Sequence, residues 1–197
     1  MQLTESVLTN DFVRLEPLHE RHREELRSAC DADPDAFKLW LYTFAGDQFD
    51  PFWDRVRKDH ASGSWIPYAV MADGECVGIS CYIGIEPMHR ALEVGNTYYH
   101  PKARGTAVNP AAKHLMLGHA FACGANRVQF RVDATNAVSC AAMAKLGAMK
   151  EGVYRQEKTI WTGRVRDTVI FSILREEWPR VEAGLAARLA DFRSRAR

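Results

Sequence analysis

The fold of this chain turns on residues 100–110, which read His100-Pro101-Lys102-Ala103-Arg104-Gly105-Thr106-Ala107-Val108-Asn109-Pro110. The preceding residues 92–100 read as a strand that Pro101 stops, and residues 111–123 are apolar nearly all round, which is typical of a buried helix. Asn109 is a preferred N-cap residue, and Pro110 suits the first helical position. The segment therefore predicts a strand–loop–helix junction with its cap at Asn109.

This junction is also a candidate anion site. The small residues Gly105, Thr106 and Ala107 let a ligand approach the backbone closely. Free N–H groups at a helix N-terminus bind anions, and phosphates in particular. A helix that is simply well capped has the same sequence pattern, so both interpretations stay open on these residues alone.

Strands and helices can be placed outward from this junction. Before it we expect strands over residues 12–18, 66–71, 76–85 and 92–100, and helices over 19–30 and 47–60. After it we expect a strand over 127–132, a helix over 138–146, a hairpin of strands 153–161 and 165–173, and a final helix over 175–195 interrupted by Pro179.

The order of these elements predicts the fold class. Strand–helix–strand–helix in the middle implies a parallel pair of strands, and the flanking hairpins imply antiparallel pairing. We therefore expect an α/β (α+β) fold with one domain over residues 1–197. Its sheet should be mixed, mostly antiparallel and twisted, with six to seven strands, a central parallel pair and flanking helices.

Composition narrows the function classes. The 197 residues are 47% hydrophobic and 26% charged, and the formal net charge of +1 gives no large attraction for nucleic acid or an anionic membrane. There is no secretory signal pattern and no apolar run of the roughly 20 residues that span a bilayer. The odd number of cysteines, without a Cys-x-x-Cys pair, indicates reduced thiols. We expect a cytoplasmic protein, monomeric or homodimeric.

Metal chemistry is not indicated. His19 and His22 form a His-x-x-His pair, but no further Cys or His follows at ligand spacing. We therefore expect the pair on a helix surface and no metal site.

A second strand–loop–helix junction runs from Asp133 to Ser139. Asn136 stands just after the strand over 127–132 and just before the helix over 138–146. It is a good N-cap candidate, and Ser139 falls in the first helical turn. A residue that caps a helix can also bind a ligand.

Taken in order, these segments resemble the GNAT superfamily of acetyl-coenzyme A-dependent N-acetyltransferases. The closest resemblance is to the branch that acetylates alanine and serine N-termini of ribosomal proteins. It covers nearly the whole chain and rests on the order and spacing of short pieces: Val13-Arg14-Leu15, Glu93-Val94-Gly95, His100-Pro101, Arg104-Gly105-Thr106 and Asn136…Ser139…Lys145-Leu146-Gly147.

The resemblance implies a GNAT-like fold and acetyl-CoA as co-substrate. Arg104 holds the first position of the family's pyrophosphate loop, whereas Ala107 stands where Gly is usual and Asn109 where Gly or Ala is usual. Carried over position by position, the coenzyme contacts implied by the resemblance are Tyr98, Tyr99, Arg104, Gly105, Thr106, Ala107, Val108, Asn109, Asn136 and Ser139.

The implied reaction moves an acetyl group to a primary amine, either a protein N-terminal α-amine or a small-molecule amine, by direct attack in a ternary complex. The amine must lose a proton, and the leaving thiolate can need one. By resemblance Ser139 is the candidate general acid near the coenzyme sulfur. We favour Glu93 as general base, with Glu157 as the alternative; an exposed strand carboxylate is the competing interpretation of either.

Two other functions stay open. The departures at Ala107 and Asn109 are compatible with a catalytically weak CoA-binding module. The aromatic helix around residues 49–56 is compatible with a protein-interaction domain.

Overall fold

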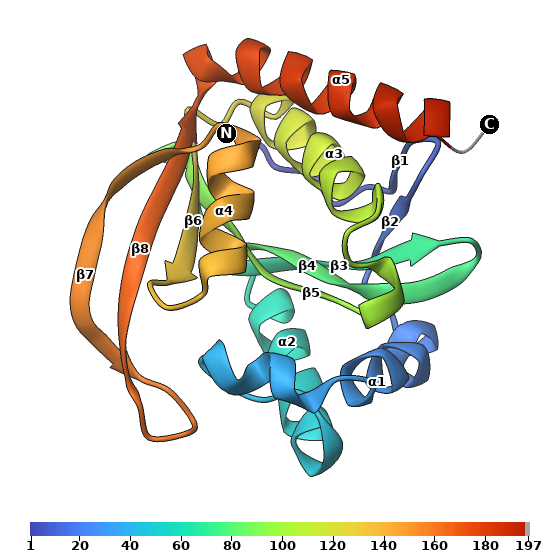
Figure 1. Cartoon of the computed structure of the whole chain (residues 1–197), viewed down its shortest axis with the longest axis vertical. Coiled ribbons are helices and arrows are strands. Elements are labelled where there is room, and N and C mark those ends of the chain that lie inside the picture. Colours follow the sequence, from blue (N-terminus) through green and yellow to red (C-terminus); the bar gives the residue numbers. More distant parts are fainter. Residues whose placement is uncertain (196–197) are drawn as a thin grey trace.

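One mixed sheet runs through the molecule, for which a computed structural model describes residues 1–195. The remaining residues, 196–197, end the predicted domain and lie outside the described chain. The strand order is β1-β2-β3-β4-β5-β6-β8-β7, and within these described residues only β5 and β6 pair in parallel (Figure 1). The strands are β1 (Leu8–Thr9), β2 (Arg14–Pro17), β3 (Trp65–Ala72), β4 (Glu75–Glu86), β5 (Ala91–Tyr99), β6 (Arg127–Asp133), β7 (Met149–Thr159) and β8 (Val165–Leu174).

The predicted fold class and central parallel pair are confirmed. The sheet has eight strands, one beyond the expected range. The addition is β1, a two-residue strand in which Leu8 and Thr9 pair with Leu15 and Arg14 of β2. A segment this short carries no readable alternation, so sequence periodicity misses it.

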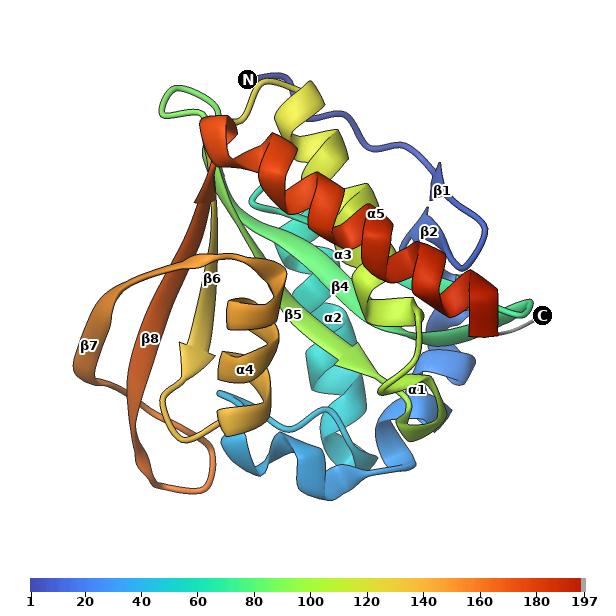
Figure 2. The same cartoon turned by 45° about the horizontal axis from the view of Figure 1, so that its top comes forward.

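Helices cover both faces of the sheet (Figures 1 and 2). One face carries α1 (Arg23–Asp31) and α2 (Phe49–Ala61), and we name it the acceptor face after the expected place of the amine. The other carries α3 (Val108–Ala122), α4 (Ala137–Leu146) and α5 (Trp178–Arg195), and we name it the coenzyme face after the expected place of acetyl-CoA. Short 3-10 turns complete the chain: η1 (Glu20–His22), η2 (Pro34–Leu39), η3 (Gly46–Gln48), η4 (Pro101–Ala103) and η5 (Arg175–Glu177).

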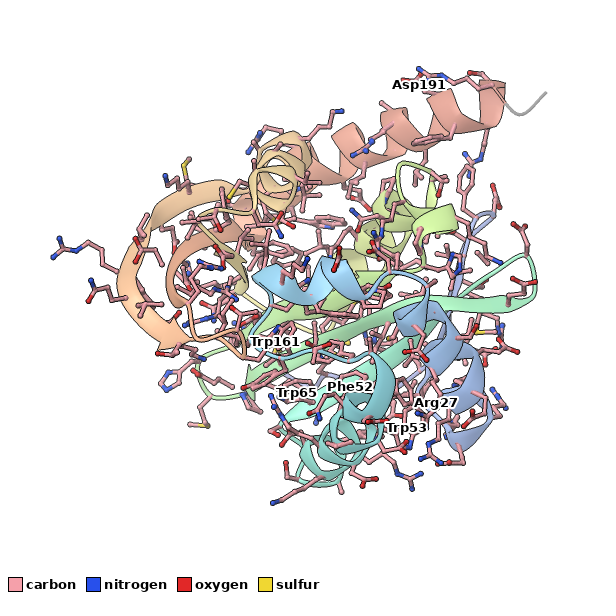
Figure 3. The ribbon with its side chains drawn as sticks, turned by 60° about the horizontal axis from the view of Figure 1, so that its bottom comes forward. Arg27, Phe52, Trp53, Trp65, Trp161 and Asp191 are labelled. Atoms are coloured by element: carbon pink, nitrogen blue, oxygen red, sulfur yellow. The ribbon has the colours of Figure 1, made fainter. Side chains whose placement is uncertain are left out.

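Each face has its own hydrophobic core. On the coenzyme face, Leu92 and Val94 of β5 pack with α3 and α5, and the buried hydroxyl of Tyr82 donates to the carbonyl of Met116 at 2.7 Å. On the acceptor face, Phe37 stacks on Tyr98 with ring centroids 4.7 Å apart. Figure 3 shows Phe52, Trp53, Trp65 and Trp161 gathered on that side, with Asp191 of α5 on the opposite side.

The two parallel strands separate soon after they meet. Pairing between β5 and β6 is limited to Ala91–Glu93 with Arg127–Gln129, and Figure 2 shows the strands diverging beside α4. Asn96 adopts a φ of 51°, and three register steps of β5 oppose two of β4. This is a β-bulge, and the extra residue exchanges the faces of the side chains that follow it.

Three local expectations were wrong. Helix α3 begins at Val108 with Ala107 at its N-cap, so Asn109 lies inside the first turn. Helix α5 begins at Trp178, so Pro179 lies in the first turn, where its missing N–H costs nothing, and does not interrupt the helix. His22 is buried, not on a surface, and its Nε2 lies 3.1 Å from Glu16 Oε2.

The cysteines, the metal-binding side chains and the helix lengths complete the description of the fold. The five cysteines are free, and three of them are buried. Within residues 1–195, no three metal-binding side chains gather into a site. The same part of the chain contains no helix with the length and hydropathy needed to span a bilayer.

Candidate active site

The junction between β5 and α3 presents unsatisfied backbone donors. Gly105 has a φ of +75°, a conformation that L side chains rarely adopt. The Thr106 hydroxyl donates to the carbonyl of Ala103 at 2.7 Å and accepts from the amide of Val108 at 3.2 Å. The described residues offer no acceptor to the amides of Gly105, Thr106, Ala107 and Asn109. These free donors at a helix N-terminus fit an anion.

Two side chains of this junction, which were expected to contact phosphate, are arranged differently. Asn109 Oδ1 is buried without a partner in the described chain, so it caps nothing. The Arg104 side chain turns back: its Nε donates to the carbonyl of Tyr99 at 2.9 Å, and its guanidinium pairs with Asp33. Asp33 thus partly offsets the charge of Arg104, and the backbone amides are the donors that remain free.

The junction between β6 and α4 is instead capped by a side chain. Asn136 is the N-cap of α4, as predicted, and its Oδ1 accepts from the amide of Ser139 at 3.0 Å. Buried Asp133 accepts from Arg164 and from both the amide and hydroxyl of Thr135. Burial alone would raise the pKa of Asp133, but these hydrogen bonds outweigh it and hold the pKa below its ordinary value. Ser139 is half-buried.

Tyr98 and Tyr99 project to opposite faces of β5. The Tyr98 hydroxyl donates to the carbonyl of Ala29 at 2.9 Å on the acceptor face. The Tyr99 hydroxyl is buried on the coenzyme face without a partner among the described residues. Both backbones pair with β4 on one side only, because β6 has already diverged on the other. That free side is suited to hydrogen bonds with an extended ligand.

Glu93 lies on the acceptor face where the strands separate. Its carboxylate extends along the strand over Gly95, where an added Cβ would lie 2.5 Å from Glu93 Oε1. It forms no ion pair with any described residue. Burial raises the pKa of Glu93 to about 7, against the opposing pull of Arg131, Lys158, Arg166 and Lys113. A carboxyl group with such a pKa can accept a proton near neutral pH.

Glu157 is less available. It pairs with Arg131 of β6, across the intervening strand β8, and its side chain is only 16% exposed. The backbone of β7 is bulged beside it, since Gln156 has a φ of 51°. This arrangement holds the Glu157 carboxylate against a guanidinium, whereas Glu93 has no such partner.

The structure adds a polar group that the sequence did not predict. Lys113 of α3 is buried at 5% exposure, and its Nζ donates to Thr97 Oγ1 at 3.0 Å. Thr97 in turn bonds to the hydroxyl of buried Ser80 at 2.7 Å. The available signal was one lysine inside a helix that is otherwise apolar nearly all round.

The acceptor face is closed by a contact between distant segments. The indole N–H of Trp161 donates to the carbonyl of Phe37 at 2.8 Å, and the amide of Trp161 donates to the carbonyl of Leu41 at 3.3 Å. The turn between β7 and β8 is thereby tied to η2. Free backbone amides on one face and a carboxyl group of raised pKa on the other lie on either side of the strand separation.

Comparisons with known proteins agree with this geometry. Residues 13–149 match the family model of the acetyltransferase (GNAT) domain. A structure described as an acetyltransferase from T. thermophilus is 33% identical, with a TM-score of 0.85 over 96% of this chain and 100% of its own. A GCN5-related N-acetyltransferase from Brucella melitensis is 28% identical, with a TM-score of 0.86 over 93% and 85%.

A more distant structure shares the fold alone. Mycobacterium smegmatis RimJ, solved in complex with CoA-disulfide, is 22% identical, with a TM-score of 0.77 over 89% of this chain and 88% of its own. The comparison with curated proteins gave no match. Two findings decide the family: the match to the family model, and the T. thermophilus structure, which this chain covers almost completely. The chain belongs to the GNAT family of acetyltransferases, which are acyltransferases.

Proposed function

We propose that the chain is an N-acetyltransferase that moves the acetyl group of acetyl-CoA to a primary amine by direct attack in a ternary complex. The acceptor is a protein N-terminal α-amine or a small-molecule amine. One observation carries the proposal. Where β5 leaves β6, free backbone donors open on the coenzyme face, and an unpaired carboxyl of raised pKa lies on the acceptor face.

The α3 junction would hold the coenzyme's pyrophosphate. Its free amides supply hydrogen bonds, and the helix N-terminus favours negative charge. Arg104 would fix the loop through Tyr99 and Asp33 rather than grip a phosphate alone. The free edge of β5 at Tyr98 and Tyr99 would pair with the pantetheine arm, and the amide nitrogen of Asn136, whose oxygen caps α4, would contact the same arm.

Bound acetyl-CoA supplies an activated acetyl group as a thioester. Glu93 would accept the proton that the attacking amine loses, because its raised pKa keeps it near balance at neutral pH. Glu157, already paired with Arg131, stays the alternative base. Ser139 would present its hydroxyl to the sulfur as hydrogen-bond donor and candidate general acid.

Binding and turnover test the proposal in turn. Acetyl-CoA should raise the melting temperature, because a ligand that binds only the folded state stabilises it by mass action. Initial rates with a panel of small amines and short peptides should then reveal an acceptor. Intersecting double-reciprocal lines are expected for a ternary complex, whereas parallel lines would indicate a covalent acetyl-enzyme.

Matched ligands separate the alternatives. A peptide with a blocked N-terminus controls for the α-amine. Binding of acetyl-CoA without turnover of any amine would support the CoA-binding module. Absence of both the thermal shift and calorimetric binding at saturating acetyl-CoA would reject the proposal.

A further inference from the structure

Lys113 occupies an unusual place for a charged side chain. It lies on the buried face of α3, whose inward neighbours Ala112 and Met116 are fully buried and apolar. Lysine is almost never this buried unless it is paired. Among the described residues no carboxylate lies within ion-pair distance of its Nζ. An apolar side chain would fill this position at lower cost, so packing alone does not account for a lysine.

The Nζ atom lies at the strand separation. It donates to Thr97 of β5 at 3.0 Å and stands 5.7 Å from the ring centroid of Phe130 on β6. Both residues lie beyond Glu93 and Gln129, the last pair that joins the two strands. Nζ therefore lies on the coenzyme face, beside the gap where β5 and β6 no longer form hydrogen bonds with each other.

The bulge in β5 gives Lys113 its one hydrogen bond. Glu93 and Gly95 face the acceptor side, and the extra residue at Asn96 turns Thr97 to the coenzyme side. Of the three N–H donors of a lysine ammonium, the described chain satisfies only the one that reaches Thr97. Two donors thus remain for a ligand that enters the gap.

We propose that Lys113 is a catalytic residue, which stabilises the thiolate leaving from acetyl-CoA and gives it a proton. The inference rests on the proposed function. It assigns the coenzyme side of the reaction to Lys113, just as the acceptor side belongs to Glu93. In this assignment the charged Lys113 gives the proton, and the uncharged hydroxyl of Ser139 donates a hydrogen bond to the same sulfur.

The proton and electron balance is complete. The amine nitrogen forms a bond to the thioester carbon, the carbon–sulfur bond breaks, and its electron pair stays on sulfur. Sulfur takes a proton from the Lys113 ammonium, and Glu93 takes the proton from the amine. Exchange with solvent returns a proton to Lys113 and removes one from Glu93, so no oxidant, reductant or further reactant is needed.

The electrostatic surroundings suit this role. Burial lowers the pKa of Lys113 to about 7, while Cys81 on β4 and Glu93 on β5 pull it back upward. These are the titratable groups of the packed strands whose charges act on Nζ. An amine poised near neutrality can both hold and release a proton at working pH. A thiolate beside it would favour the ammonium form.

The first experiment reads the sulfur directly. The ultraviolet difference spectrum between the CoA complex and the acetyl-CoA complex, followed against pH, reports thiolate, because acetyl-CoA has no free thiol. In the native protein the bound thiol should have a pKa lower than free CoA by about 1–2 units. Lys113→Met should abolish the shift, and Lys58→Met, on the exposed side of α2, should keep it.

The second experiment uses catalysis. Lys113→Met should lower kcat roughly 10²-fold with little change in the KM for acetyl-CoA, and the loss should shrink as pH rises. Thr97→Val keeps the amine but removes its anchor and should cost much less. Equal losses in the two variants at every pH would reduce Lys113 to a strand anchor and overturn the proposal.

Failure of this inference can be told from failure of the proposed function. If acetyl-CoA neither binds nor turns over, the proposed function fails. If acetyl-CoA turns over but bound CoA shows no shifted thiolate titration, only the role of Lys113 fails. The native protein alone gives that spectrum, so the test holds even where Lys113→Met does not fold.

Discussion

The two strand–loop–helix junctions look alike in sequence and differ in their hydrogen bonds. Each follows a strand, and each offers an asparagine near the helix start. At β6–α4, Asn136 caps the helix and Asp133 is satisfied by its neighbours. At β5–α3, Ala107 provides no cap and the amides stay free. The capped junction uses its own side chains as acceptors, whereas in the proposed function the free amides of the uncapped one would be completed by a ligand.

The largest expected effect concerns the carboxylate just before the uncapped junction. Glu93→Gln should lower kcat about 10³-fold, because it removes the acceptor of the amine's proton, and should leave acetyl-CoA affinity unchanged. A pH profile of kcat/KM should lose its acidic limb near pH 7. Glu157→Gln is the matched variant. If that variant loses the limb and Glu93→Gln keeps it, the role of base passes to Glu157.

The next effect comes from converting the open junction into a capped one. Ala107→Asp places an N-cap carboxylate among the free amides of α3. Acetyl-CoA affinity, measured by calorimetry, should fall roughly 10²-fold through competition and charge repulsion. Ala107→Ser caps without a charge and should weaken binding less. Undiminished binding by Ala107→Asp would place the pyrophosphate elsewhere.

The two carboxyl groups near the junctions should also differ in how they affect stability. The pKa of Glu93 is raised from 4.5 to about 7, so between these values the folded protein binds more protons than the unfolded chain. Its contribution to the free energy of unfolding therefore falls as pH rises through this window. At about 1.4 kcal/mol per pKa unit, and after a reduction for solvent screening, the fall should be roughly 2 kcal/mol.

Asp133 acts in the opposite direction. Its pKa is lowered, so its contribution is present above the ordinary carboxyl pKa and is lost only as pH falls through the lowered value. Denaturant melts of the native protein and Glu93→Gln at pH 4.5, 6 and 8 give the comparison. Curves that stay parallel across this range would contradict the raised pKa of Glu93.

The smallest effect is at the capped junction. Asn136→Ala should cost about 1 kcal/mol of stability, because it leaves the amide of Ser139 without its acceptor. Thermal melts without ligand measure this loss. A melting curve unchanged from that of the native protein would remove the distinction between the two junctions.

The two junctions also differ in how well the sequence predicts them. The order of strands and helices, the parallel pair and the cap at Asn136 follow from periodicity and residue preference. The start of α3 does not: burial of Ala107 and Val108 in the coenzyme-face core draws the helix back from Asn109. A good N-cap residue stabilises a helix by about 1 kcal/mol, and the burial of apolar side chains such as these can contribute more.

The sequence predicts the surroundings of the candidate site only in part. It offers both Glu93 and Glu157 as candidate bases, but their different environments depend on Arg131, which reaches Glu157 from another strand. The bulge at Asn96, which decides the face of Thr97, carries no local signature in the sequence. Lys113 interrupts an apolar helix, yet its burial depends on where that helix packs.

The tie between Trp161 and η2 bears on how this protein can change its acceptor in evolution. In the proposed function, residues near Phe37 and Leu41 would form one wall around the acceptor, and a turn more than a hundred residues later in the chain would form the other. The two strand–loop–helix junctions lie between these segments in sequence. New acceptors would then be accessible through paired substitutions in two short segments, inherited together, with the residues proposed to hold the acetyl donor left unaltered.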